Sequence, residues 1–396
     1  MDIGLEQSAR SRKQKVKIAF FCGNMSHSGG TERVLSVIAN ELSERGHTVS
    51  VISLWGEGTS FFPLYKRIHV YWVERERHQK GIVGNFRYLT AILRHERPEY
   101  LIDVDMILGC YSFFLKWRRP DLCWISWEHF NYYYHFRKNC FLRKIIRRIA
   151  GRFADRLVVL TEEDKRYYQE NMKLHCGISQ IYNPLPYTQR ASRNAGSLTG
   201  AGGLRPSKYT QGEGLKKEEF PVIFAAGRLT RAKGYDLLIQ SWSLLEKRYP
   251  QWKVIVAGDG EEEKRLKRQA YKAGLKRFYF AGNVADIERY YEKAAFFVLP
   301  SRDEGFGMVL IEAMHFSLPV VAYRCKAGPG EIVDDGETGY LVEPGNVEAF
   351  AEKMRILMEN EEIRRIMGEK AKKSVKRFDR KMIADEWESL LCGKGK

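Results

Sequence analysis

The chain has no CxxC pair, and its seven cysteines are scattered singly along 396 residues. Isolated cysteines of odd number do not form a disulfide framework, so we expect a reduced, cytoplasmic protein with buried thiols. The sequence also lacks any uncharged apolar run of about 18 residues, which predicts no transmembrane helix. Its polar and then basic N-terminus lacks the apolar stretch of a signal peptide. We therefore expect any work at a membrane to be done peripherally, on the inner face.

Acidic residues are fewer than basic residues: the chain has 49 Asp and Glu and 66 Lys and Arg, which gives a net charge of +17. This balance favours a polyanionic partner, such as nucleic acid, an anionic bilayer surface or a phosphorylated substrate. No RRM, zinc-finger or helix-turn-helix signature occurs, so we expect no nucleic-acid partner. Hydrophobic residues make up 44% of the chain, enough for real cores. At about 150 residues per domain, the length predicts two or three domains.

The first half alternates between apolar β-rich runs and amphipathic stretches. VKIAFFC (16–22) precedes a glycine loop, then a helix with apolar residues at helical spacing, then VSVISL (49–54). Strand, glycine loop, helix and strand form a βαβ unit, and continuous apolar strands favour a parallel sheet covered on both faces. Further strands are expected at 68–73, 100–108, 123–127, 156–161 and 178–183.

A compositional break divides the chain. Residues 186–219 are rich in Gly, Ser, Thr and Lys and predict a flexible interdomain linker. We expect an N-terminal doubly wound domain over 16–185, a second over 220–377, and a C-terminal helix over 378–396 that crosses back to the first. The fold class is thus α/β, with two Rossmann-like domains. Ligands of such sheets bind at the carboxyl ends of the strands, so the cleft between the domains is the expected site.

One strand-to-helix junction of the second domain carries two carboxylates. In SRDEGFGMVLIEAM, Glu304 lies in the loop that follows the strand AFFVLP. Gly305 and Gly307 allow the backbone to turn and a ligand to approach the amides. A helix is expected to begin near Met308, where free N–H groups favour a phosphate, and Glu312 inside it could reach a diol. The alternative is two solvated glutamates without a ligand.

A dinucleotide oxidoreductase is another α/β candidate. The G-x-G-x-x-G fingerprint is absent, because Gly258-Asp259-Gly260 is followed by three glutamates that would repel a pyrophosphate.

Residues 136–153, FRKNCFLRKIIRRIAGRF, predict a basic amphipathic helix without any acid. Such a helix suits an anionic membrane surface near an acceptor. The residues proposed for this side are Arg143, Lys144, Arg147 and Arg148. The alternative is a helix packed on the first domain with a solvated basic face.

The second half resembles the retaining glycosyltransferases of family 4 (glycosyltransferase group 1), which have the GT-B fold of two Rossmann-like domains facing across a cleft. The E-x7-E motif is met by Glu304 and Glu312, and AGRLTRAKG, GNV, PVVAYR and GETGYLVEPGN follow the family's order from about residue 220 to 395. The first half matches through SGGTERV and WEHFN. The linker is longer than in the family pattern.

The resemblance implies a nucleotide-sugar donor held by the second domain. Arg228 and Lys233 would grip the diphosphate, whose growing negative charge fixed cations stabilise without a metal. Glu304 would bind hydroxyls of the donor sugar, and Glu312 the ribose diol. The residues after Glu304 would support the phosphates and the sugar hydroxyls; these are Gly305, Phe306, Gly307, Met308 and Val309. The nucleotide base would lie by the GNV loop, at Asn283 and Val284.

In the first domain, the resemblance places Gly29 and Gly30 against the donor phosphate and His129 facing the donor sugar. The alternative to what the resemblance implies is that the two glycines form a tight turn without a ligand and that His129 has only a structural role. The reaction retains anomeric configuration by front-face displacement, in which the leaving phosphate helps to deprotonate the acceptor. We therefore expect no separate general base, no metal and no cofactor.

The resemblance implies transfer of a hexose or N-acetylhexosamine, from a UDP-sugar in preference to GDP-mannose. The expected acceptor is a saccharide or a polyprenyl-linked saccharide of bacterial surface polysaccharide or glycolipid synthesis. A non-catalytic membrane scaffold on the same fold is the alternative of a different class. The presence of Glu304, Glu312, Arg228 and Lys233 argues against it.

Overall fold

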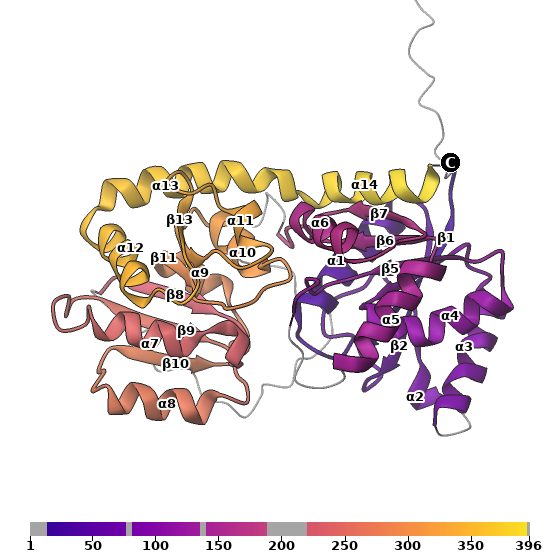
Figure 1. Cartoon of the computed structure of the whole chain (residues 1–396), viewed down its shortest axis with the longest axis horizontal. Helices are drawn as coiled ribbons and strands as arrows, with labels where there is room; N and C mark the ends of the chain where they lie inside the picture. The colour runs from indigo at the N-terminus through magenta and orange to yellow at the C-terminus, as the bar shows by residue number, and fades with distance from the viewer. Residues whose placement is uncertain (1–13, 77–80, 135–139, 188–219, 394–396) are drawn as a thin grey trace, which may run out of the picture.

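The computed structural model describes residues 14–76, 81–134, 140–187 and 220–393. Their first half forms a seven-stranded sheet in the order β3-β2-β1-β4-β5-β6-β7, with every strand pair parallel (Figure 1). The strands are β1 Lys17–Asn24, β2 Thr48–Trp55, β3 His69–Trp72, β4 Tyr100–Val104, β5 Cys123–Trp127, β6 Arg156–Val159 and β7 Gly177–Gln180.

Helices cover this sheet because its strands are apolar on both faces. β1 and β2 are buried along almost their whole length, as a parallel sheet between two helical layers requires. The helical segments are α1 Gly30–Glu44, α2 Val73–Glu76, α3 Ile82–Glu96, η1 Met106–Leu108, α4 Gly109–Arg118, α5 Cys140–Phe153 and α6 Glu162–Asn171.

The second half forms a six-stranded parallel sheet in the order β10-β9-β8-β11-β12-β13. Its strands are β8 Val222–Ala226, β9 Lys253–Ala257, β10 Phe278–Gly282, β11 Ala294–Leu299, β12 Val320–Tyr323 and β13 Gly339–Val342. Its helical segments are η2 Arg231–Lys233, α7 Tyr235–Ser243, α8 Glu263–Lys272, α9 Glu288–Lys293, α10 Met308–His315, α11 Pro329–Ile332, α12 Val347–Glu359, α13 Glu361–Ser374 and η3 Val375–Phe378. We call the parts built on the two sheets the first and second domains.

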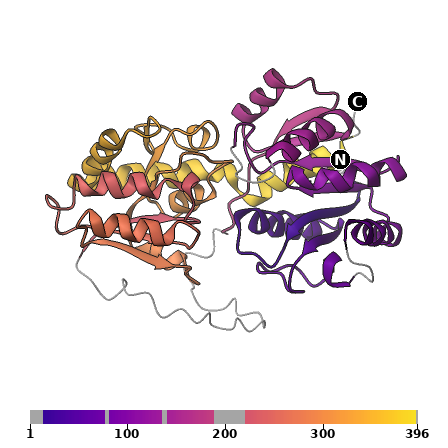
Figure 2. The ribbon, with the colours of Figure 1, turned by 60° about the horizontal axis from the view of Figure 1, so that its bottom comes forward.

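The last helix, α14 (Arg380–Cys392), leaves the second domain and lies on the first, as the yellow ribbon along the top of Figure 1 shows. The Trp387 ring meets the Trp127 ring edge to face at 4.7 Å between centroids. Arg45 of the first domain donates to Glu388 at 3.2 Å, and His47 Nε2 lies 3.1 Å from the other Glu388 oxygen. Figure 2 shows α13 and α14 running across both domains.

Aromatic side chains fill the junction between the domains. Tyr182, Phe306 and Phe378 meet with ring centroids 5.2 to 5.9 Å apart. They belong to or pack against one hydrophobic cluster that includes core residues of both sheets. The two domains are therefore joined through apolar contact near the cleft.

Two expectations from the sequence need comment. The strand expected over 100–108 ends at Val104, because Asp105 has φ 109° and its side chain accepts from Ile107 N to cap a helical turn. The apolar residues after it belong to η1 and α4. Of the expected linker 186–219, residues 188–219 lie outside the described residues. None of the helices in the described ranges has the length and apolarity to cross a bilayer.

Replacing Trp387 with alanine should destabilise the protein by about 3–5 kcal/mol, because a fully buried indole is lost from the contact between α14 and the first domain. Urea unfolding followed by tryptophan fluorescence and circular dichroism measures the change. Met382→Ala is the control on the same helix, since Met382 is 52% exposed, and it should change stability by less than about 0.5 kcal/mol. Equal effects of the two variants would contradict the packing of α14.

Candidate active site

The loop between β11 and α10 places Glu304 at the carboxyl end of the central strand. Glu304 is buried, and its Oε1 accepts from Lys233 Nζ at 2.6 Å and from Ser301 Oγ at 2.7 Å. The helix begins at Met308, as the sequence predicts, after Gly307 with φ 100°. The positive φ is favourable only for glycine, so the turn that aims the α10 amides at the cleft depends on it.

The two cations expected in the cleft follow β8. Lys233 ends η2 and forms the ion pair with Glu304. Arg228 is exposed, and its charge faces the Glu32 carboxylate of α1 across the cleft, where it opposes the rise in the pKa of Glu32 that burial causes. β8 and β11 are neighbours in the sheet, so the cations and Glu304 meet at one edge.

Glu312 is buried one turn into α10. Its Oε1 accepts from Arg33 Nη1 at 3.0 Å, and its Oε2 accepts from the Tyr291 hydroxyl at 3.1 Å. Burial raises the pKa of Glu312, while Arg33 and Tyr291 oppose that rise. Both oxygens of the carboxylate expected to bind a diol thus already have protein donors.

At Gly305 the backbone of the second domain lies against the backbone of the first. A Cβ at residue 305 would lie 2.1 Å from the carbonyl oxygen of His129. Beside it, Asn131 Nδ2 donates to Asp303 Oδ1 at 2.6 Å and to the Glu304 carbonyl at 2.7 Å. The WEHFN segment of the first domain therefore lies directly on the loop that carries Glu304.

His129 follows β5 and is buried beside the Trp127 ring, 4.4 Å away between centroids. Burial lowers its pKa to about 3, so the imidazole is neutral near pH 7. Its Nε2 is buried and has no hydrogen-bond partner in the part of the chain that the structure describes. A buried polar atom of this kind is costly unless something pairs with it.

Gly29 and Gly30 lie at the N-terminus of α1, opposite α10. Gly29 is the N-cap, and a Cβ there would lie 2.3 Å from Glu32 Oε2, because the Glu32 side chain folds back over the helix start. A Cβ at Gly30 would lie 3.9 Å from Met308 Cγ of the second domain. The two helix N-termini therefore meet at the cleft.

The remaining residues expected to bind the donor surround this core. Phe306 is buried in the aromatic junction, and Met308 and Val309 open α10 and pack on the hydrophobic cluster. Asn283 and Val284 follow β10 at the same end of the sheet, Asn283 exposed and Val284 packed on that cluster. They precede α9, which carries Tyr291 to Glu312.

The structure divides the four basic residues of α5. Arg143 makes two hydrogen bonds to Asp105, at 2.8 and 2.7 Å, and its guanidinium lies over the Phe130 ring. Arg147 is buried and donates to the Tyr132 carbonyl at 2.7 Å. Lys144 and Arg148 are exposed on the other side.

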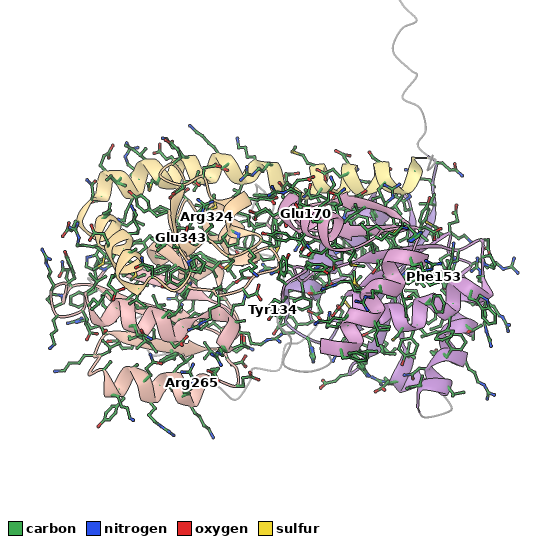
Figure 3. The ribbon with its side chains drawn as sticks, viewed as in Figure 1. Tyr134, Phe153, Glu170, Arg265, Arg324 and Glu343 are labelled. Carbon is green, nitrogen blue, oxygen red and sulfur yellow. The ribbon has the colours of Figure 1, made fainter. Side chains whose placement is uncertain are left out.

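Sequence reasoning missed several residues of the cleft wall. Arg33 and Asn131 lay inside the quoted motifs SGGTERV and WEHFN but were not selected. Buried Glu128 was also missed; burial raises its pKa to about 7, Asp105 adds to the rise, and Arg143 opposes it. Tyr134 is labelled in Figure 3 where the two domains meet. Their position directly after a strand or in a glycine loop was the available signal.

Comparison with known families identifies the class. Residues 209–374 match the model of the glycosyl transferases group 1, and residues 28–188 match the model of glycosyltransferase family 4. An uncharacterized glycosyltransferase from Haemophilus influenzae is 31% identical over 378 residues, covering 95% of this chain and 99% of that protein. The chain therefore belongs to the group 1 (family 4) glycosyltransferases, as the sequence motifs indicate.

More distant relatives agree in length. One is 27% identical over 386 residues (95% of this chain, 98% of the relative): GalNAc-alpha-(1->4)-GalNAc-alpha-(1->3)-diNAcBac-PP-undecaprenol alpha-1,4-N-acetyl-D-galactosaminyltransferase of Campylobacter jejuni. Sucrose-phosphate synthase from Thermosynechococcus elongatus superposes with a TM-score of 0.77 at 18% identity, covering 95% of this chain and 98% of that one. Anabaena HepE, solved with UDP and glucose, superposes with a TM-score of 0.73 at 20% identity, covering 96% and 100%. These structures confirm the two-domain GT-B fold.

Replacing Gly305 with alanine should lower transferase activity at least tenfold, because the new methyl group would collide with the His129 carbonyl and hold the domains apart. Circular dichroism should show that both domains remain folded. Gly330→Ala is the matched control: it also faces the first domain, but its Cβ would meet only side-chain ends at 3.7 and 3.8 Å. Full activity of the Gly305 variant would contradict the close contact.

Proposed function

We propose that this glycosyltransferase transfers a hexose or N-acetylhexosamine, with retention, from a UDP-sugar to a saccharide or lipid-linked saccharide of bacterial polysaccharide or glycolipid synthesis. The observation that carries the proposal is the junction of the two domains at Glu304. Lys233, Glu304 and the start of α10 lie on the second domain, and the His129 backbone of the first domain lies against Gly305 beside them.

The side of the site that the second domain builds suits a diphosphate followed by a sugar. A lysine ammonium has three donors, so Lys233 keeps two for phosphate oxygens after its bond to Glu304. Arg228 adds a second cation, and the amides from Gly305 to Val309 add donors. Fixed positive charge stabilises the leaving nucleotide as it gains charge, which supports a reaction without metal or cofactor. Glu304 remains available to accept from sugar hydroxyls, and Asn283 and Val284 would lie by the base.

The first domain supplies the opposite contacts. His129 Nε2, one of the buried polar atoms without a partner among the described residues, is the atom that we expect a donor-sugar hydroxyl to satisfy. The donor phosphate would approach the start of α1 at Gly29 and Gly30 only after the Glu32 carboxylate, which folds over that helix start, has moved away. The leaving phosphate itself would receive the acceptor proton, so no protein base is assigned.

The relatives favour polysaccharide chemistry and UDP. Amylovoran biosynthesis glycosyltransferase of Erwinia amylovora is 26% identical over 385 residues. The relative from Campylobacter jejuni acts on an undecaprenol-linked saccharide by its name, and HepE was solved with UDP-glucose. We infer a similar lipid-linked acceptor and a UDP-sugar for this chain.

Thermal-shift screening of the purified protein against UDP-, GDP- and other nucleotide sugars tests the donor. We expect UDP and UDP-sugars to raise the melting temperature, and nucleotide to be released from one of them when acceptor is added. A shift with GDP-mannose alone would assign mannosyl transfer instead. Binding without any nucleotide release would favour the non-catalytic scaffold, and no binding at all would overturn the proposal.

Docking to the inner membrane surface is proposed for the outer side of the first domain. The exposed side chains there alternate large apolar with basic residues over α4 and α5: Phe114, Trp117, Phe141, Ile145, Phe153, Lys144, Arg148 and Arg152. Figure 3 labels Phe153 on the side that faces away from the second domain. Aromatic and basic residues together are typical of an interfacial helix. Arg143 and Arg147 are bonded to groups of the first domain and are not part of this surface.

Changing Lys144 and Arg148 to glutamate should abolish most binding to vesicles that contain anionic lipid, because each basic residue near such a surface contributes about 1 kcal/mol. Co-sedimentation with anionic and neutral vesicles measures it. The control is the same pair of changes at Lys264 and Arg268, an exposed Lys and Arg with the same spacing on α8 of the second domain. Equal binding of the wild type to both vesicle types, or none, would count against docking.

A further inference from the structure

One ion pair joins the two domains directly across the cleft. Arg33 lies in the first turn of α1, and its Nη1 donates to Glu312 Oε1 of α10 at 3.0 Å. The residues are 279 positions apart in the chain. Since the starts of α1 and α10 also approach each other at Gly30 and Met308, this pair exists only while the domains are close.

The Arg33 guanidinium is held in place by more than its charge. It lies over the Tyr187 ring at 5.1 Å and over the Phe62 ring at 5.8 Å from their centroids. Tyr187 itself stacks on His315 of α10, with centroids 5.3 Å apart. Arginine suits such a position, because its planar group stacks on rings while its N–H groups bond a carboxylate.

Glu312 depends on partners because its carboxylate is almost removed from water, with a side chain 5% exposed. Arg33 supplies a hydrogen bond to one oxygen and Tyr291 to the other. An ionised carboxylate has about four lone-pair positions, so one on each oxygen remains for a diol. A buried carboxylate that loses its cation is strongly disfavoured.

We propose that Arg33 is a positioning residue: it orients Glu312 from the opposite domain, so that the site for the donor ribose is complete only when the cleft is closed. The proposal rests on the proposed function for its ligand. Arg33 touches neither the sugar nor the phosphates in this scheme. Its loss therefore weakens donor binding and leaves the chemical step intact once donor is saturating.

The variant Arg33→Met tests this in the full-length protein. We expect the donor KM to rise at least tenfold while kcat stays within threefold of wild type. Glu312→Ala should raise the donor KM similarly. The double variant should have a donor KM no higher than that of Glu312→Ala alone, because both changes remove the same Arg33–Glu312 interaction. Arg33→Lys keeps the charge and should recover part of the affinity, which a purely steric role would not allow.

The pH profile gives a second readout. Glu312 faces Arg33 of α1, Tyr291 and Glu288 of α9, and Tyr187. Without Arg33, no cation among these groups opposes the effect of burial, so Glu312 takes up a proton at higher pH. The acid limb of kcat/KM should then move to higher pH in Arg33→Met and not in the control.

The matched control is Arg380→Met. Arg380 Nε bonds Glu41 Oε1 at 2.7 Å and so ties the other end of α1 to α14, away from Glu312. This variant should keep wild-type KM and pH profile. Small-angle scattering without nucleotide separates the two proposals, because Arg33→Met should increase the radius of gyration even if no nucleotide sugar binds the wild type.

If the wild-type protein binds no nucleotide sugar, the proposed function is wrong. The radius of gyration from small-angle scattering still tests whether the Arg33–Glu312 ion pair holds the domains together. A well-folded Arg33→Met protein with wild-type KM, pH profile and radius of gyration would overturn the proposal. A variant that loses only kcat would overturn it as well.

Discussion

The need to stabilise two buried carboxylates governs the rest of the cleft. Glu304 and Glu312 are both nearly removed from water, and a carboxylate in that position is costly unless charged or polar donors meet it. Glu304 is met within its own domain by Lys233 and Ser301. Glu312 is met half by its own domain and half by Arg33 of the other. Glu312 is thus fully paired only when the two domains are in contact.

Much of the second domain could be predicted, because its signals are local. Alternating apolar strands and helices predict a doubly wound sheet, and glycines after a strand predict the turn before α10. The contacts of Arg33 and Asn131 could not be predicted, since they join residues 279 and 172 positions apart and leave no periodic pattern. The prediction of a strand over 100–108 is wrong beyond Val104 for a local reason. The apolar run after Asp105 is buried in a helix, and a buried helix and a buried strand look alike in sequence.

The basic helix α5 shows what the number of charged residues in a segment can and cannot predict. Its sequence predicts one amphipathic helix rich in arginine over 136–153, and α5 is that helix over 140–153, while residues 136–139 lie outside the described residues. The pattern does not reveal that Asp105, brought in from the end of β4, takes Arg143, or that Tyr132 and Tyr168 cover Arg147. Arg143 and Arg147 therefore hold parts of the first domain together. Only the tertiary partners distinguish a cation that holds the protein together from one that is free for a surface.

The position of α14 affects the order in which the protein can fold during synthesis. Trp127 completes its packing with Trp387, and 260 positions separate the two. At about 5–20 residues per second, the ribosome needs roughly 10 to 50 seconds to make that stretch. During this time the first domain carries an uncovered apolar patch. The surface around Trp127 therefore stays without its cover in the nascent chain until the last helix emerges.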